Sequence, residues 1–466
     1  MTSPPASPVR DAILDHIDAT TFDRLPAEVV AATNVVIADT IACGLAGSAE
    51  SKAKIVRDLQ LNHFGFGGVP VWGTDQLYSP IGAGMANGYQ VHCLEYACFH
   101  EAATVHSMSV ILPAVMAYAD RFGRVSGKDI ITAVNIGNDV AALLGLSASK
   151  GARFFRPGVC GAMGAGAALA KLEGLDRPST AEFFGLIYSQ LSGTMQAHTE
   201  ASMALGLQIA FSVRNVLTAL DMARMYLTGP VDVFDGPYGY FNLFETHGDA
   251  APHLQSLGTV WRTAEISFKP YPSGRASHGV IDALVRLMKA QAFTPGDVSK
   301  VVLSVPPFVH SLGGRPATAD MHGPHARLCL PYLAASALMD GCISVATYAL
   351  DTMANRDRLA LAEKIKVEVN ENSDVNALAP QTIAVTLSDG RQFDDTVTCL
   401  LGHPDNPMTD SQHRAKFMES AASAAQPLEG DVADTLYTRL LSLQNETDVS
   451  VLSNLATGFD IEKAQI

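Results

Sequence analysis

The chain has 466 residues, of which 48% are hydrophobic and 17% are charged, against a usual charged share of about 25%. This composition excludes a disordered chain, a fibre and a small disulfide scaffold, and the length allows two or three domains. The 32 basic and 47 acidic side chains leave a net charge of -15, which predicts no nucleic-acid partner and no anionic membrane partner.

The cysteines and the apolar runs indicate the compartment. Seven cysteines, an odd number, lie mostly in apolar runs without a CxxC pair, as is typical of buried thiols in a reducing environment. The first residues, MTSPPASPVR, lack the apolar core of a signal peptide. The long uncharged run 76–94 contains Pro80, Asn87 and His92 and is too polar to span a bilayer. A cytoplasmic location is therefore predicted.

Residues 11–227 have a helical pattern almost throughout, with apolar residues at helical spacing in AEVVAATNVVIADTIACGLAG. Gly161, Gly164 and Gly166 are spaced like a nucleotide-binding loop, but that loop follows a β-strand and precedes an acidic residue about 20 positions later. Here a Phe/Arg/Pro turn precedes the glycines and an Ala-rich helix continues after them. Close packing between helices explains them better, so no NAD or ATP site is predicted.

After residue 263, β-branched residues become frequent in SKVVLSVPPFV, IKVEVN and QTIAVTLSDGRQF, where SDG predicts a turn between strands. The segment PHARLCLPYLAASALMDG predicts an amphipathic helix between the first strand and the others. Helical periodicity returns at about 408–455, which favours packing back on the first domain. The predicted fold is mainly α: a large all-helical domain, 1–264 plus 401–466, with an inserted smaller α+β domain, 265–400.

Polar side chains concentrate first in VHCLEYACFHEAATVHS. Its His, Glu and Cys residues are potential metal ligands, but Thr104 stands where the zincin motif HExxH needs its second His, so no metal is predicted. We expect His92 and Cys98 to be satisfied core residues. His106 precedes the apolar run SMSVILPAVMAYA, where a side chain can point into a cleft, and is therefore a candidate base.

The second concentration is EISFKPYPSGRASHGVIDAL, where two prolines stiffen a loop and a helix starting near Ser277 directs its positive end toward it. Arg275 can hold a carboxylate through two nitrogens. Desolvation and the neighbouring Arg275 would lower the pKa of Lys269 toward a value useful for a base. No GxSxG motif and no protease-type cysteine is present, so a nucleophilic hydrolase is not predicted.

These two segments resemble the MmgE/PrpD family, as do VVIADTIACGLAG, RPGVCGAMGAGAALAKLEGL and RLCLPYLAASALMDG, in that family's order and spacing. The family includes 2-methylcitrate dehydratase, cis-aconitate decarboxylase and iminodisuccinate epimerase. The resemblance covers most of the chain. It implies a helical domain with a smaller α+β insert, an active site in the cleft between them, no organic cofactor and usually a homodimer.

The first segment departs from the pattern of the dehydratase and decarboxylase members. Those members typically carry an acidic residue, a pair of aspartates and then Thr or Tyr. Glu95 fills the acidic position here, but Ala97 and Cys98 replace the pair and Phe99 replaces the hydroxyl residue. Groups that would protonate a leaving hydroxyl or position a departing carboxylate are therefore missing.

Two further positions also lack a polar residue that the family carries. The family's catalytic histidine before the glycine-rich helix is Phe155, although Arg156 beside it keeps a cation. The lysine of the next helix is an apolar position near Leu205. His106 and Lys269 remain, and together they are enough to remove a proton from one face of a carbon and return it to the other.

The sequence therefore favours a cofactor-independent isomerase similar to iminodisuccinate epimerase, acting on an α-carbon of a small dicarboxylate by two-base proton transfer. The expected catalytic residues are Lys269 and His106 as opposed bases, Tyr271 as acid or relay, and Glu95 and His100. The expected substrate-binding residues, whose arginines would also stabilise the enolate, are Arg156, Ser273, Arg275 and Glu101.

Two alternatives stay open at this point. One is a lyase of the same family, 2-methylcitrate dehydratase-like or cis-aconitate decarboxylase-like, in which His100 and Glu101 replace the missing groups. The other is a catalytically inactive relative that only binds a carboxylate ligand. All three interpretations share a small anionic carboxylate as the partner.

Overall fold

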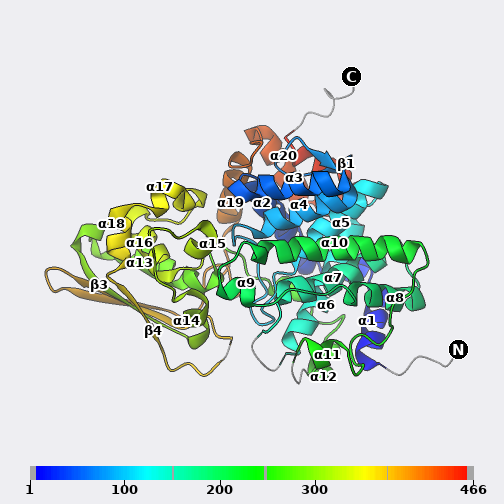
Figure 1. Ribbon diagram of the computed structural model, residues 1–466, viewed down its shortest axis with the longest axis horizontal. Coiled ribbons are helices and arrows are strands. Elements are labelled where there is room, and N and C mark those ends of the chain that lie inside the picture. Colours follow the sequence, from blue (N-terminus) through cyan, green and yellow to red (C-terminus); the bar gives the residue numbers. More distant parts are fainter. Residues whose placement is uncertain (1–6, 149–151, 246–248, 375, 459–466) are drawn as a thin grey trace.

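The computed structural model describes residues 7–148, 152–245, 249–374 and 376–458, and the fold is mainly α with a small sheet domain (Figure 1). The long helices of the larger, helical domain are α1 (Pro8–Ala19), α2 (Ala27–Ser48), α3 (Ser51–Phe64), α4 (Pro80–His92), α5 (Met108–Phe122), α6 (Gly127–Leu146), α7 (Arg156–Glu173), α8 (Arg177–Tyr188) and α10 (Ala204–Arg224). Its short helices are α9 (Gln196–Thr199), α11 (Tyr240–Leu243) and α12 (Ala251–Leu254).

Local sequence signals place the helix ends that matter for the site. Ser79 caps α4 by accepting a hydrogen bond from the Gly82 backbone, and Pro80 opens the helix with its φ already suited to it. The helix ends at His92, so the polar segment that follows runs as a loop to the start of α5. Pro157 likewise lies in the first turn of α7, which begins at Arg156 without a side-chain cap.

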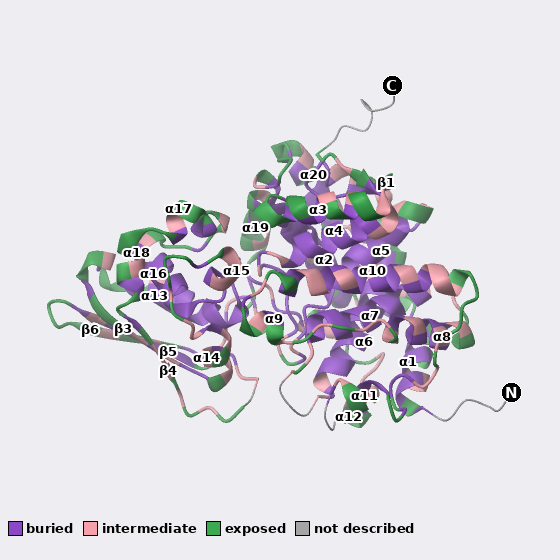
Figure 2. Cartoon of the chain, in the orientation of Figure 1, coloured by how far each residue is buried: buried purple, intermediate pink, exposed green. Residues whose placement is uncertain are grey.

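Small residues let the core helices approach closely, as predicted for the glycine-rich helix. A Cβ on Gly164 would lie only 2.4 Å from the Gly137 carbonyl oxygen of α6, and a Cβ on Gly161 would lie 2.9 Å from Val110. The packing explanation of these glycines is confirmed. Buried residues run continuously through these helices (Figure 2).

Two helices of the described chain, α2 and α6, are long and apolar enough to cross a membrane by length and composition. In this fold 78% and 89% of their apolar windows are buried inside the protein. Helices that are apolar on all sides are typical of a large protein core.

The smaller domain is built on a four-stranded sheet of order β4-β3-β5-β6. Its strands are β3 (Val298–Val305), β4 (Ile365–Val369), β5 (Gln381–Leu387) and β6 (Gln392–Val397). β3 pairs parallel with β4 and antiparallel with β5, and Leu303 lies opposite Val367 and Ile383. Buried and exposed residues alternate along β5, as expected for a sheet with one covered face.

Helices α13 (His278–Gln291) and α16 (Leu330–Asp340) pack on that sheet and on each other. The remaining helices of this domain are α14 (Pro307–Gly313), α15 (Gly323–Ala326), α17 (Leu350–Met353) and α18 (Arg356–Ala362). The predicted turn in SDG joins β5 to β6, with Gly390 at a φ of 91° that favours glycine.

The chain then returns to the helical domain. Helices α19 (Asp410–Ala422) and α20 (Gly430–Leu441) pack against α2, and α21 (Ser450–Leu455) against α20 (Figure 1). The larger domain is not wholly helical, because β1 (Phe66–Pro70) and β2 (Leu77–Tyr78) form a small antiparallel sheet. The glycine-rich FGGVP has no alternating pattern by which this strand was predictable.

Candidate active site

A cavity of about 440 Å³ lies where the two domains meet, and both polar segments of the sequence contribute to it. The helical domain supplies His92, Glu95, Phe99, His106, Phe155, Arg156, Met195, His198 and Leu205. The α+β domain supplies Lys269, Arg275, Ser277, Phe308, Arg327 and Leu328. The two candidate bases, His106 and Lys269, therefore share one cavity.

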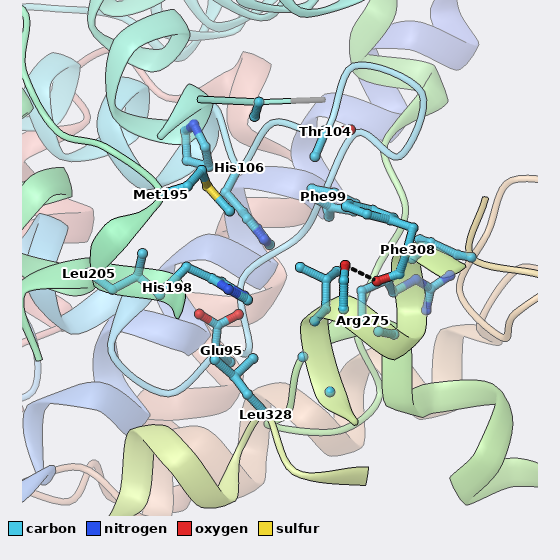
Figure 3. Close-up of a pocket in the computed structure, with 18 of the residues that line it drawn as sticks. Glu95, Phe99, Thr104, His106, Met195, His198, Leu205, Arg275, Phe308 and Leu328 are labelled. Carbon is cyan, nitrogen blue, oxygen red and sulfur yellow. Dashed lines mark hydrogen bonds between the residues drawn. The ribbon is translucent and has the colours of Figure 1, made fainter. Parts of the chain in front are cut away.

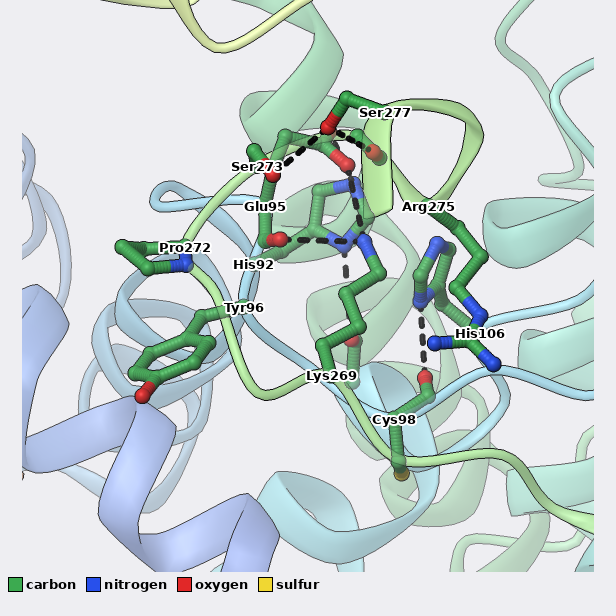
Figure 4. A network of polar contacts seen from close by, with 12 residues as sticks. His92, Glu95, Tyr96, Cys98, His106, Lys269, Pro272, Ser273, Arg275 and Ser277 are labelled. Atoms are coloured by element: carbon green, nitrogen blue, oxygen red, sulfur yellow. Dashed lines mark hydrogen bonds and ion pairs between the residues drawn. The ribbon is translucent and has the colours of Figure 1, made fainter. Parts of the chain in front are cut away.

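Glu95 and Lys269 form an ion pair in this cavity (Figure 4). The Lys269 Nζ donates to the Glu95 backbone oxygen at 3.0 Å and lies 3.3 Å from the carboxylate oxygen Oε2. Burial lowers the pKa of Lys269, although Glu95 opposes this shift. Burial would raise the pKa of Glu95, but Lys269 and His92 lower it to about 2, so the carboxylate is ionised at neutral pH.

The backbone of Glu95 is strained. Its φ is 53°, a left-handed conformation that costs a residue other than glycine about 1–3 kcal/mol. The conformation brings the Glu95 backbone oxygen and carboxylate to the same ammonium group. Such strain is typical of functional sites.

His106 is held as a neutral base. Its Nδ1 lies 2.8 Å from the Cys98 backbone oxygen, which can only accept a hydrogen bond, so Nδ1 carries the proton and Nε2 keeps a lone pair. The ring packs on Phe99 at a centroid distance of 4.5 Å. Burial, and then Lys269 and His92, lower the pKa of His106 well below 6.5.

Two further histidines surround Glu95. His92 is buried, and its Nδ1 lies 3.4 Å from the Ser109 hydroxyl, as expected of a core histidine. Its Nε2, however, lies 3.7 Å from the Glu95 carboxylate and has no hydrogen-bond partner within the described residues, so that expectation holds for one ring nitrogen only. Burial lowers its pKa to about 4. His198 on α9 directs its ring toward Glu95 (Figure 3), and burial lowers its pKa while Glu95 opposes the shift. The sequence offered no signal for His198 beyond its residue type.

Arg327, which follows α15, is the residue that the sequence interpretation missed. It is only 4% exposed and lines the cavity, yet its guanidinium makes no ion pair or hydrogen bond with any described residue. Its charge is balanced only by the face of the Tyr348 ring, 4.8 Å away. A buried, unpaired guanidinium is unfavourable, so this position is suited to an anionic ligand.

The two arginines expected to bind substrate are already paired. Arg156 lies 2.6 Å and 3.1 Å from the two carboxylate oxygens of Glu245. Arg275 lies 2.7 Å from Glu101 and also donates to the backbone oxygens of Phe268 and Leu401. Because both guanidiniums have internal carboxylates, neither is the free clamp that the sequence suggested, and Glu101 neutralises Arg275 instead of binding ligand.

Three other expected site residues do not line the cavity. His100 pairs with Glu265 at 3.0 Å, and Tyr271 donates to Asp282 at 2.6 Å. Ser273 lies 2.8 Å from the hydroxyl of Ser277, which does face the cavity. His100 lies in the loop between α4 and α5, and Tyr271 and Ser273 lie in the loop before α13, so polar side chains in both loops point away from the cavity as well as into it.

Lys416 on α19 binds the backbone of both polar segments that form the site. Its fully buried Nζ forms an ion pair with Asp39 at 2.7 Å and donates to the backbone oxygens of Tyr96 and Lys269. It also lies 3.9 Å from the centre of the Tyr96 ring. The C-terminal tail thereby fixes the backbone beside Glu95 and at Lys269.

The rest of the cavity wall is apolar. Three of the positions at which the sequence departs from the family pattern, Phe99, Phe155 and Leu205, line it. Met195 and Phe308 face it as well (Figure 3). Among the residues that the structure describes, no three His, Cys, Asp or Glu side chains are grouped as metal ligands. The site combines a proton acceptor (His106 Nε2), a proton donor (the Lys269 ammonium) and the Arg327 cation with a wall of low polarity.

Comparison with known proteins is consistent with this arrangement. Residues 11–253 match the MmgE/PrpD N-terminal domain and residues 271–435 match the MmgE/PrpD C-terminal domain. The chain belongs to the MmgE/PrpD family.

Its relatives include enzymes named as decarboxylases. The cis-aconitate decarboxylase-like protein oryM of Aspergillus oryzae is 30% identical, over 93% of this chain and 94% of its own. The cis-aconitate decarboxylase of Mus musculus is 27% identical over 84% and 82% of the two chains. That of Aspergillus terreus is 25% identical over 93% and 92%.

Proposed function

We propose that the chain is a lyase that decarboxylates a small unsaturated polycarboxylate, and that cis-aconitate is the first substrate to test. The observation that carries this proposal is Arg327, a buried cation that has no counter-ion within the described part of the chain and faces a cavity with Lys269 and a neutral His106. A cavity of about 440 Å³ suits a small ligand. The named decarboxylases among the relatives support the same class of reaction.

Arg327 would hold one carboxylate of the substrate in bidentate fashion. The carboxylate that leaves would lie against Phe99, Phe155 and Leu205, which offer it no hydrogen bond. An apolar environment disfavours the concentrated charge of a carboxylate more than the dispersed charge of the transition state for loss of CO₂. The family positions that are apolar here are thus compatible with decarboxylation.

The reaction would break the bond between the β-carbon and its carboxylate, and CO₂ would leave. The electron pair of that bond would form a new double bond to the neighbouring carbon, while the pair of the original double bond would move to the far carbon of the allylic system, which takes a proton. Lys269 uses two of its three N–H bonds on Glu95, which leaves one to donate that proton. Water would then reprotonate Lys269.

His106 is suited to the opposite transfer, since its Nε2 lone pair can accept a proton from carbon. His106 would remove a proton from carbon in a substrate whose double bond must shift toward the leaving carboxylate before CO₂ is lost. The acidic pair that Ala97 and Cys98 replace is typical of dehydratase and decarboxylase members alike, so its loss does not separate the two reactions; the relatives named as decarboxylases rank decarboxylation first.

Epimerisation, the activity favoured by the sequence, is the second candidate. One observation favours it: His106 and Lys269 place a proton acceptor and a proton donor in one cavity. The two candidates differ in whether a carbon–carbon bond breaks. The relatives named above are decarboxylases, which ranks the lyase first.

The deciding experiment incubates the protein with cis-aconitate and a panel of di- and tricarboxylates in D₂O and follows them by NMR. A decarboxylase gives a product one carbon shorter with one solvent deuteron on carbon. Deuterium at an α-carbon without loss of CO₂ would instead identify an epimerase. Ligand binding without either change would identify an inactive carboxylate-binding relative.

A further inference from the structure

A second, larger cavity of about 870 Å³ adjoins the first. The two cavities share His92, Glu95, Leu205, Arg327 and Leu328 in their walls. The larger cavity is therefore not a separate surface hollow but continues from the proposed reaction site.

Arg327 lies where the two cavities meet. Its guanidinium stacks over Tyr348, which lines only the larger one, and Tyr348 is fixed by donating a hydrogen bond to the Pro272 backbone oxygen at 2.7 Å. Arg327, which is more than nine-tenths buried and unpaired among the described residues, can therefore contact a ligand that lies in the larger cavity.

The larger cavity is mostly apolar beyond Arg327. Leu94, Val345 and Met353 line it, and Met203 and Leu350 are 40% and 82% exposed at its rim. Glu50, Lys52 and His322 also contribute to its wall. The apolar part of the wall offers no hydrogen bond to a second carboxylate. It suits hydrocarbon, whose burial is favourable in proportion to the area removed from water.

We propose that the substrate carries an alkyl or aryl substituent, which occupies the larger cavity while the carboxylate head binds Arg327. The inference rests on the proposed function for the head of the ligand. A small tricarboxylate would fill only the smaller cavity, whereas a substituted one uses both. The substrate class is thus a polycarboxylate with an apolar tail.

The test uses unreactive probes, so it does not depend on turnover. Calorimetry would measure the Kd of succinate, butylsuccinate and hexylsuccinate for the full chain. A fully buried methylene is worth roughly fourfold in affinity, so hexylsuccinate should bind at least about 50-fold more tightly than succinate. Equal affinity for all three probes would overturn the proposal.

Two tryptophan variants locate the tail. Ala346→Trp fills the larger cavity from an exposed position and should bring the ratio of the Kd of succinate to the Kd of hexylsuccinate close to one. Ala415→Trp, at an exposed position on α19 outside both cavities, should preserve the ratio. Persistence of the ratio in Ala346→Trp would overturn the proposal.

A second copy of the chain is the other possible occupant of the larger cavity. In that case Ala346→Trp would change the molar mass measured by light scattering while the probes showed no dependence on tail length, and the proposal would fail. If tails bind as expected but no carboxylate loses CO₂, the proposed function fails while the tail site stands.

Discussion

At the scale of single residues, the site depends on which charges are left without internal partners. Arg156 and Arg275 have the carboxylates of Glu245 and Glu101 beside them, whereas Arg327 has, among the described residues, only an aromatic face. The free energy cost of that buried cation is recovered only when an anion binds. Affinity for carboxylates should therefore reside in Arg327.

Substitution of Arg327 tests this assignment. Arg327→Gln should weaken succinate binding by roughly 10- to 100-fold, since a charge-assisted bidentate contact is worth about 1.5–3 kcal/mol. Arg286→Gln, which removes the exposed pair with Asp395, is the matched control and should not change the Kd. Unchanged binding in Arg327→Gln would place the carboxylate elsewhere.

Lys269 and His106 should both matter for turnover. Lys269→Met removes the proton donor, and His106→Asn removes the neutral acceptor. Loss of a positioned acid or base costs roughly 10²–10⁴-fold in rate, measurable as CO₂ release or deuterium exchange. Lys54→Met, on the surface of α3, is the control. Near-normal rates with intact circular dichroism would remove both residues from the mechanism.

The pH dependence follows from the directions of the two pKa shifts. His106 must be neutral, and its pKa is lowered, so activity should rise with pH along a limb well below pH 6.5. Lys269 must be protonated, and its pKa is also lowered, so activity should fall along a limb below pH 10.5. A profile of kcat/KM that is flat to pH 10.5 would contradict the assignment of Lys269.

At the scale of elements, the C-terminal helix α19 matters because of Lys416. Lys416→Met should lower the free energy of unfolding by about 3–5 kcal/mol, because it leaves Asp39 buried without its counter-ion. The double variant with Asp39→Asn should lose less than the single one, as measured by urea unfolding. Equal losses would indicate that the charge pair is not the source of the effect.

Element types were largely predictable from periodicity, since the helices before residue 227 and the strands after residue 298 follow apolar patterns of 3.6 and 2 residues. The β1–β2 sheet was not, because FGGVP lacks alternation. Which loop residues face the cavity was not predictable either. His100 and Tyr271 are close in sequence to residues that line the cavity. Their two loops direct them elsewhere, His100 toward Glu265 and Tyr271 toward Asp282.

At the scale of the whole molecule, the two domains are joined by charge pairs that cross the cleft. Glu101 from the helical domain binds Arg275, and Glu95 binds Lys269. The chain carries a net charge of -15, so an anionic substrate approaches against the overall field and needs a local cation such as Arg327.

The pair between Arg275 and Glu101 should contribute to the stability of the whole chain. Arg275→Met should cost about 3 kcal/mol, since it leaves Glu101 unpaired and frees the Phe268 and Leu401 backbone oxygens. Calorimetry should show a melting temperature lower by roughly 6–12 °C, at 2–4 °C per kcal/mol. The surface control Arg286→Gln should melt as the unsubstituted chain does. A matching melting temperature in Arg275→Met would show that the pair does not hold the domains.

The sequence by itself determined the family, the mainly α fold with its sheet domain, and the two segments that meet at the site. These follow from local patterns and motif order, which a linear chain contains. Only the tertiary structure decided which cations are free, because pairing depends on residues far apart, such as Arg156 with Glu245 and Lys416 with Asp39. The proposal of Arg327 as the anion site has the same origin: that it has no ion-pair partner among the described residues is a property of the assembled cavity.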